Sequence, residues 1–126
     1  MKSKGICIEG YRALPFSQVV RAGDLLFVSG QTAYDGDTGR VEVQGLSAQV
    51  ELVLERISDM LRQCGGSLDD VVKVNAFLKN RTDFATFNSV YARYFKTAPP
   101  ARTTVVVDFC ADVLVEIEAV ACVPQR

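Results

Sequence analysis

Histidine is missing from this chain altogether. Without an imidazole group, the protein cannot form a Ser-His-Asp or Cys-His nucleophilic site, a histidine-ligated metal site or a two-histidine ribonuclease site. Any catalysis must therefore rely on the side chains of Arg, Asp, Glu, Tyr, Thr, Ser or Cys.

An excess of positive charge is missing as well. The chain has 14 Lys and Arg residues against 15 Asp and Glu residues, which gives a formal net charge of -1. Because there is no basic surplus to neutralise a phosphate backbone over a broad surface, nucleic acid is not an expected partner. The composition that is present, 48% hydrophobic and 23% charged residues in a length of 126, predicts one ordinary globular domain spanning residues 1–126.

Cysteine is sparse and dispersed. The four cysteines are Cys7, Cys64, Cys110 and Cys122. They form no C-x-x-C pair, and no second cluster of ligands is present that could complete a zinc site. The start, MKSKGICIEGYR, contains no apolar segment of a signal peptide, and no apolar run is long enough to span a bilayer. An even number of cysteines would permit two disulfides in a secreted protein. The other signals favour a reducing compartment, so we predict free thiols, a cytoplasmic location and no membrane partner.

Several short segments have the composition of strands. The N-terminal third predicts three of them, over residues 5–9, 17–21 and 25–29, with a turn at residues 22–24. The stretch QTAYDGDTGR after Gly30 predicts a surface loop. Residues 71–79, VVKVNAFLK, are rich in Val and predict a strand that is buried on at least one face.

Two segments have the periodicity of amphipathic helices. Ser47 is the expected N-cap of the first, which ends at Gly65 and Gly66. Its apolar positions recur at steps of three and four, at Val50, Val53, Leu54, Ile57, Met60 and Leu61.

The second helix is expected to begin after Thr82 or Asp83 and to end before Pro99. An aromatic stripe at helical spacing predicts core packing for Phe84, Phe87, Tyr91 and Phe95. Asn88 is the position in this helix whose polarity packing does not explain.

The last quarter of the chain predicts two strong strands with a short connection at residues 110–112. The element order is then β-β-β-α-β-α-β-β, an α+β domain with two helices on one face of a single sheet. In the hairpin register that the short connection suggests, Thr104 lies opposite Glu118, and Arg102 is the diagonal neighbour of Glu118. We therefore expect this guanidinium and this carboxylate to lie together on the sheet face that the helices leave uncovered.

This expected pair has two interpretations. The simpler one is an exposed cross-strand ion pair, which contributes little energy. The same face would also carry Val106, Leu114 and Val120, and another subunit usually covers a mixed face of this kind. In that case the charges would lie at an interface, where burial makes them useful for chemistry.

Several motifs together resemble one family. They are LPFSQ at residues 14–18, FVSGQ at 27–31, GGSLDDVVKVNAFL at 65–78, DFATFNSVYARYF at 83–95, PPAR at 99–102 and VEIEAVA at 115–121. Their order and spacing along essentially the full length are similar to those of the RidA family of imine and enamine deaminases, also called the YjgF family.

The resemblance implies a chorismate-mutase-like fold with a six-stranded mixed sheet. It also implies a homotrimer in which the sheets form a central barrel and the sites lie between subunits. The implied activity is that of a hydrolase acting on reactive 2-imino acids, formed from 2-aminoacrylate-type enamines, and releasing 2-oxo acids and ammonia. Neither a metal nor an organic cofactor is implied.

The resemblance assigns roles to particular residues. Arg102 matches the arginine that grips the substrate carboxylate, and Glu118 matches the carboxylate that activates the attacking water and helps to protonate the departing nitrogen. Gly30, after Ser29, matches a strand end whose backbone approaches the ligand, and Asn88 matches an asparagine near the cleft. The structural alternatives are a turn at Gly30 and helix-to-loop hydrogen bonding by Asn88.

Two substrate-binding positions depart from the family pattern. Phe16 stands where the branch that acts on small imines usually has Tyr, and Thr104 stands where that branch often has Cys. Losing the phenol hydroxyl removes a hydrogen-bond partner and keeps an aromatic wall. Two alternatives therefore stay open. One is action on another enamine or imine such as aminomuconate, and the other is a non-enzymatic binding role, including the endoribonuclease or translation-inhibitor role attached to this family.

Overall fold

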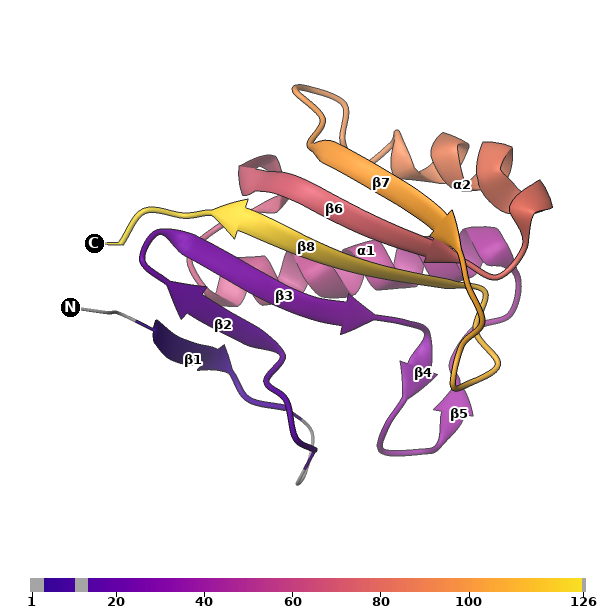
Figure 1. Cartoon of the computed structure of the whole chain (residues 1–126), viewed down its shortest axis with the longest axis horizontal. Helices are drawn as coiled ribbons and strands as arrows, with labels where there is room; N and C mark the ends of the chain where they lie inside the picture. Colours follow the sequence, from indigo (N-terminus) through magenta and orange to yellow (C-terminus); the bar gives the residue numbers. More distant parts are fainter. Residues whose placement is uncertain (1–3, 11–13, 126) are drawn as a thin grey trace.

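Six strands form one mixed sheet, and two helices cover one of its faces (Figure 1). The computed structural model describes residues 4–10 and 14–125. The strands lie in the order β1 (Lys4–Ile8), β2 (Val19–Ala22), β3 (Leu25–Gln31), β8 (Val115–Cys122), β6 (Val71–Leu78) and β7 (Ala101–Val106). This arrangement confirms the predicted α+β class and element order. None of the helices in these residues is long and apolar enough to cross a lipid bilayer.

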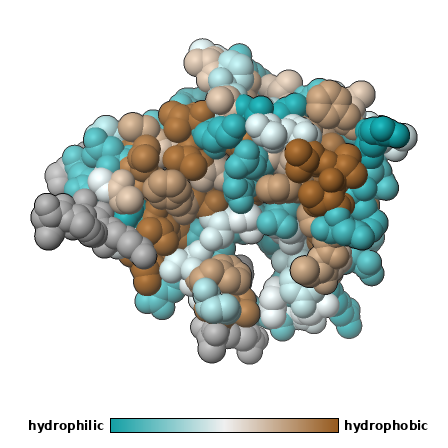
Figure 2. Space-filling model, in the orientation of Figure 1, coloured by the Kyte–Doolittle hydropathy of each residue, from teal (hydrophilic) through white to brown (hydrophobic). Residues whose placement is uncertain are grey.

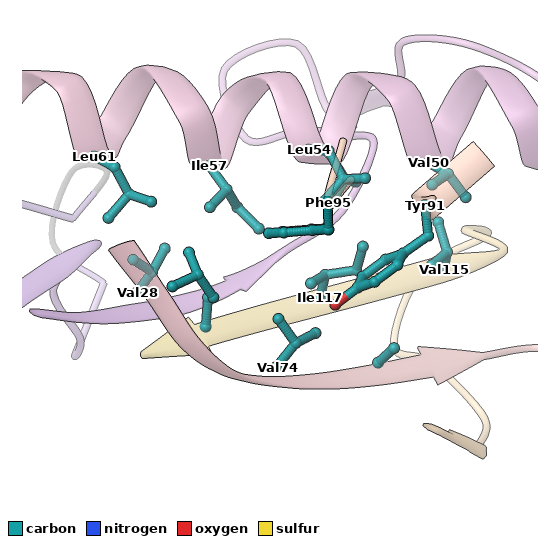
Figure 3. Close-up of a cluster of buried hydrophobic side chains, with 14 of the residues drawn as sticks. Val28, Val50, Leu54, Ile57, Leu61, Val74, Tyr91, Phe95, Val115 and Ile117 are labelled. Carbon is teal, nitrogen blue, oxygen red and sulfur yellow. The ribbon is translucent and has the colours of Figure 1, made fainter. Parts of the chain in front are cut away.

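Helix α1 (Leu46–Gln63) lies along the sheet and packs its apolar side against it (Figure 1). The resulting core includes Val28, Val50, Leu54, Ile57, Leu61, Val74, Val115 and Ile117 (Figure 3). Full burial of each Leu or Ile side chain stabilises the fold by about 1.5–3 kcal/mol. The prediction of Ser47 as N-cap is wrong, because the cap residue is Gly45, with a φ of 89° and no side-chain cap. Glycine tolerates this left-handed conformation, so the helix begins before Ser47.

Helix α2 (Phe84–Tyr91) follows a short 3-10 turn (Arg81–Asp83) and is shorter than predicted. The helix ends at Tyr91 because the chain tightens there: the backbone N–H groups of Arg93 and Tyr94 bond carbonyls only three residues back. Pro99 is therefore not the terminator. The aromatic stripe does form core, since Phe87, Tyr91 and Phe95 are buried, whereas Phe84 is 48% exposed.

The predicted hairpin between the last two strands is wrong. Strand β7 pairs in parallel with β6, and β6 also pairs with β8, so β6 lies between the two strands that were expected to be neighbours. The strands β6 and β7 and the helix α2 form a β-α-β unit, in which a helix returns the chain to start a parallel strand. The register places Asn75, and not Thr104, opposite Glu118.

This pairing also corrects the face on which Arg102 lies. Arg102 is in register with Val74, which is completely buried beneath the helices. Paired residues share a face, so Arg102, and with it Thr104, lies on the helix-covered side. Glu118 alternates with the buried residue Ile117 and lies on the open side. One chain therefore keeps the two charged groups on opposite faces.

The predicted loop after Gly30 contains a short hairpin of its own. Strands β4 (Tyr34–Asp35) and β5 (Arg40–Val41) form a separate two-stranded sheet. Arg56 of α1 donates a hydrogen bond to the backbone carbonyl of Thr32 and forms an ion pair with Glu42. These contacts hold the segment against α1, next to the end of β3.

The prediction of free thiols is wrong for two of the four cysteines. Cys7 and Cys64 form a disulfide that joins β1 to the end of α1, with Cα atoms 6.4 Å apart, whereas Cys110 and Cys122 are free and exposed. The register of β1 against β2 shifts between Ile6 and Ile8, which places Cys7 in a bulge. A bulge re-aims a side chain. Spacing along the sequence could not show this approach, because 57 residues separate the two cysteines.

Candidate active site

Arg102 is held by neutral groups beside α2. Its Nη2 atom donates a hydrogen bond of 2.6 Å to Oδ1 of Asn88. Its guanidinium carbon lies 4.7 Å, 5.0 Å and 5.9 Å from the ring centres of Tyr91, Phe87 and Phe84, within the range of cation-π attraction. In residues 4–10 and 14–125 no carboxylate forms an ion pair with Arg102. The positive charge is therefore oriented without being neutralised.

Tyr91 and Thr104 complete the surroundings of this cation. Burial raises the pKa of Tyr91 to about 12, and the positive charge of Arg102 opposes that rise. The phenol therefore stays protonated at neutral pH and adds no negative charge. Thr104 lies two residues further along β7, on the same face as Arg102, and is half-buried. We call Arg102, Asn88 and Thr104 the Arg102 group.

Gly30 and Glu116 meet where β3 diverges from β8. The pairing of these strands shifts between Val28 and Gln31, which places a bulge at Ser29 and Gly30. A Cβ atom at Gly30 would overlap the carboxylate of Glu116. With the carboxylate of Glu116 in this place only glycine fits at position 30, so Gly30 does more than end a strand.

Ser29 connects this bulge to the segment that contains Phe16. The Oγ atom of Ser29 donates a hydrogen bond of 2.6 Å to the carbonyl of Ser17, and Phe16 directly precedes Ser17. The Phe16 side chain is 50% exposed. Ser29, Gly30 and Glu116 form a second cluster, which we call the Glu116 group, and Phe16 is linked to it through Ser17.

Glu116 is the candidate that the sequence analysis missed. It lines a cavity of about 440 Å³ together with residues that include Tyr34, Asp108 and Cys110. Burial raises the pKa of Glu116, and the negative charge of Glu118 raises it further. The described part of the chain offers Glu116 no hydrogen bond or ion pair, so its oxygens are available to a ligand. A carboxyl group in this state is suited to proton transfer.

Glu118 lies further along the open face of the sheet. It accepts a hydrogen bond of 2.9 Å from Nδ2 of Asn75, and both residues line a shallow cavity of about 220 Å³ with Lys73 and Ser29. Figure 2 shows this face as hydrophobic areas on either side of a hydrophilic band. Among the described residues, no group of three or more His, Cys, Asp or Glu side chains is placed to hold a metal ion.

One chain does not bring the two groups together. Arg102 on β7 and Glu116 on β8 are separated by β6, which corresponds to about 10 Å at the usual strand spacing. They also lie on opposite faces, because Glu116 alternates with the buried residues Val115 and Ile117. Within one chain the Arg102 group and the Glu116 group therefore do not face each other.

Comparisons with known proteins agree with this fold. The family described as Endoribonuclease L-PSP matches residues 10–123. A RutC family protein of Pyrococcus horikoshii is 45% identical over 108 residues, which cover 85% of this chain and 86% of that protein. The chloroplastic Reactive Intermediate Deaminase A of Arabidopsis thaliana is 34% identical over 108 residues, covering 85% of this chain and 58% of that protein. The crystal structure of RidA from an Antarctic Psychrobacter species matches with a TM-score of 0.82 and 34% identity, covering 93% of this chain and 95% of that one.

The chain therefore belongs to the Endoribonuclease L-PSP family, which is the RidA or YjgF family, as the motifs predicted. Names within the family differ: the family description refers to an endoribonuclease, and the plant relative is called a deaminase. The family thus includes reactive intermediate deaminases.

Proposed function

We propose that this protein is a cofactor-free hydrolytic deaminase of reactive 2-imino acids, such as 2-iminopropanoate and 2-iminobutanoate. The observation that carries the proposal is the environment of the Arg102 guanidinium. This half-buried cation is held by Asn88 and three aromatic rings. A planar guanidinium binds a carboxylate through two parallel hydrogen bonds. The exposed Phe84 ring beside it suits a short apolar side chain on the bound acid. The name of the plant relative supports the same class of reaction.

We further propose that the protein is a homotrimer with its sites between subunits. Within one chain the Arg102 group and the Glu116 group point to opposite faces, so a second copy is needed to bring an arginine and a carboxylate to one substrate. A neighbouring subunit would also cover the mixed open face, where Phe27 and Val105 are 43% and 41% exposed.

In the proposed reaction Arg102 holds the substrate carboxylate while water adds to the carbon of the C=N bond. A protein carboxylate accepts a proton from the water as the new C–O bond forms and returns it to the nitrogen, which gives a carbinolamine. The same carboxylate then transfers the hydroxyl proton to the amino nitrogen as the C=O bond forms and the C–N bond breaks, which releases ammonia and the 2-oxo acid. One water is consumed and no electrons are transferred. Since an imine carbon is already electrophilic, one anchor and one proton-transfer group suffice.

Two carboxylates are candidates for the proton transfer. The resemblance assigned this role to Glu118, which already accepts a hydrogen bond from Asn75. Glu116 has no such partner, lies against Gly30 and has a raised pKa. We therefore favour Glu116, with Glu118 as the neighbouring charge that helps to raise its pKa.

A coupled assay tests the proposal. A pyridoxal-phosphate dehydratase generates 2-aminoacrylate from serine, and pyruvate release is followed with and without this protein; threonine, bulkier precursors and aminomuconate form further arms. We expect faster release of the 2-oxo acid, and no acceleration with any substrate overturns the proposal. Glu116→Gln should lower kcat by roughly 10²–10⁴-fold, and Glu118→Gln by much less. The reverse order would return the role to Glu118, and full activity of Arg102→Ala would remove the anchor.

The family description makes RNA cleavage a second candidate function. The chain has no histidine and a formal net charge of -1, so it offers neither an imidazole acid-base pair nor a basic surplus for RNA. Incubation of the protein with single-stranded and structured RNA tests this function, and cleavage without deaminase activity would favour it.

We also propose a cytoplasmic location for this chain, although one relative is chloroplastic by name. Cell fractionation tests the location.

A further inference from the structure

Two buried glutamines lie beside the bulge of β3. Gln18 is 6% exposed and Gln31 is 5% exposed. The Nε2 atom of Gln31 donates hydrogen bonds to Oε1 of Gln18, at 2.7 Å, and to the backbone carbonyl of Ser29, at 3.0 Å. Burying an amide is costly unless its hydrogen bonds are made, so these contacts define how the Gln31 side chain is oriented.

The strand register places the Gln31 side chain at the bulge of β3. Val28 pairs with Ala119 and Gln31 pairs with Ile117, so three steps along β3 correspond to two along β8. The extra residue disrupts the ladder locally, and the side chain of Gln31 supplies a donor to Ser29 within the bulge. The backbone N–H of Ser29 donates to the carbonyl of Gln18 at 2.9 Å, which ties the other side of the bulge.

We propose that Gln31 is a positioning residue that acts through this bulge to hold Gly30 against the carboxylate of Glu116. Without the amide of Gln31, the carbonyl of Ser29 loses a partner and the bulge can relax. Gly30 would then shield Glu116 from water less well. The inference rests on the proposed function only where it concerns catalysis, because the position of Gly30 relative to Glu116 can be measured independently.

The ionisable groups around Glu116 make its titration a suitable readout. Glu118 follows it on β8, Asp108 and Cys110 line the cavity from the connection between β7 and β8, and Tyr34 lines it from β4. Removing the amide of Gln31 alters none of these charges. A change in the pKa of Glu116 would therefore report a change in its exposure to water.

Gln31→Met tests the inference, because methionine has a similar shape and lacks the amide. The pKa of Glu116 is measured by NMR from its side-chain carboxyl carbon in glutamate-labelled protein. We expect a lower pKa than in the wild type, since the carboxylate gains water. Gln18→Met leaves the bond from Gln31 to Ser29 in place and should give a smaller shift in the same direction. An unchanged pKa in the folded variants overturns the inference, and Gln18→Met decides it if Gln31→Met does not fold.

Arg21→Met is a matched control. Arg21 also ties backbone carbonyls, with bonds of 2.7 Å to Val123 and 3.3 Å to Gly23, but at the opposite end of β3. This variant should lower Tm and leave the pKa of Glu116 unchanged. In the coupled assay, Gln31→Met should move the acid limb of the kcat/KM profile in the same direction as the NMR titration. If even the wild type shows no turnover, the proposed function fails, while the titration still decides the role of Gln31.

Discussion

The carboxyl group of Glu116, the residue proposed for proton transfer, also affects the stability of the fold. Its pKa is raised in the folded protein because burial and the charge of Glu118 disfavour ionisation. A group with a raised folded-state pKa contributes stability that is fully present below its unfolded pKa and is lost as the pH rises through the folded value. Ionised Glu116 therefore destabilises the fold at neutral pH, which is typical of a functional group kept for its chemistry.

Glu116→Gln should consequently be more stable than the wild type at neutral pH, even though it loses turnover. Glutamine resembles the protonated carboxyl group, so the gain in Tm should shrink as the pH falls and vanish at about pH 4, near the ordinary pKa of glutamate. Scanning calorimetry across this range measures the difference. A variant that is less stable than the wild type at neutral pH would contradict this account of Glu116.

Gly30→Ala should lower turnover strongly while changing the stability of the fold only slightly. The added Cβ would meet the end of the flexible Glu116 side chain, which can move aside, so the loss of stability should be below about 1 kcal/mol. Turnover should fall strongly, because the carboxylate is displaced. Gly5→Ala is the matched control, since no atom lies within 4 Å of its new Cβ. Equal activity of both variants and the wild type would show that the Gly30 contact is dispensable.

At the scale of elements, the local patterns were enough to find the helices and the strands. The spacing of Val50, Leu54, Ile57 and Leu61 predicted the buried side of α1, and those residues do pack on the sheet. Periodicity succeeds here because burial of one helix face depends on neighbours within the same segment. It also identified Phe87 and Tyr91 as core, and these two rings turn out to face Arg102 as well.

Pairing between distant segments could not be predicted in the same way. A short connection suggested that β7 and β8 form a hairpin, but β7 instead pairs with β6 across the helix α2. Because of this pairing, Arg102 lies on the helix-covered face of the sheet and not on the open face that the hairpin would have given it. The proposed role of Glu116 could not be predicted for a related reason. Glu116 and Glu118 share a face, and their different neighbours, the bulge at Gly30 beside Glu116 and the amide of Asn75 beside Glu118, come from strand pairing. The sequence therefore indicated which residue types the candidate site contains. Which of these residues lie together depends on the strand register, which the sequence did not show.

The disulfide between Cys7 and Cys64 should stabilise β1, which lies at the edge of the sheet and pairs with β2. Cross-linking residues that are this far apart in sequence restricts the unfolded chain and typically contributes about 2–4 kcal/mol. Reduction with dithiothreitol, or the change Cys7→Ser, should lower Tm by on the order of 10 °C in scanning calorimetry. The double variant Cys110→Ser, Cys122→Ser should behave like the wild type, and alkylation of four thiols in the native oxidised protein would refute the disulfide.

The open face of the sheet indicates how whole molecules associate with one another. Its mixture of exposed apolar side chains and a hydrophilic band is typical of a surface that another subunit covers. The proposed site also requires a neighbouring subunit, because its arginine and its carboxylate lie on opposite faces of one chain. Sedimentation at micromolar concentration should therefore give a mass about three times the 13.8 kDa of one chain.

A charge introduced into this face should dissociate the assembly and abolish turnover together. Phe27→Glu places a carboxylate on the open face, where desolvation in an interface would be costly, whereas Thr86→Glu adds the same charge at an exposed position on α2. We expect Phe27→Glu to sediment as a folded monomer without deaminase activity, because its Arg102 group has no partner carboxylate. Thr86→Glu should remain trimeric and active. A wild-type monomer that turns over substrate would contradict an interfacial site, and an active trimer of Phe27→Glu would show that the subunits meet through another surface.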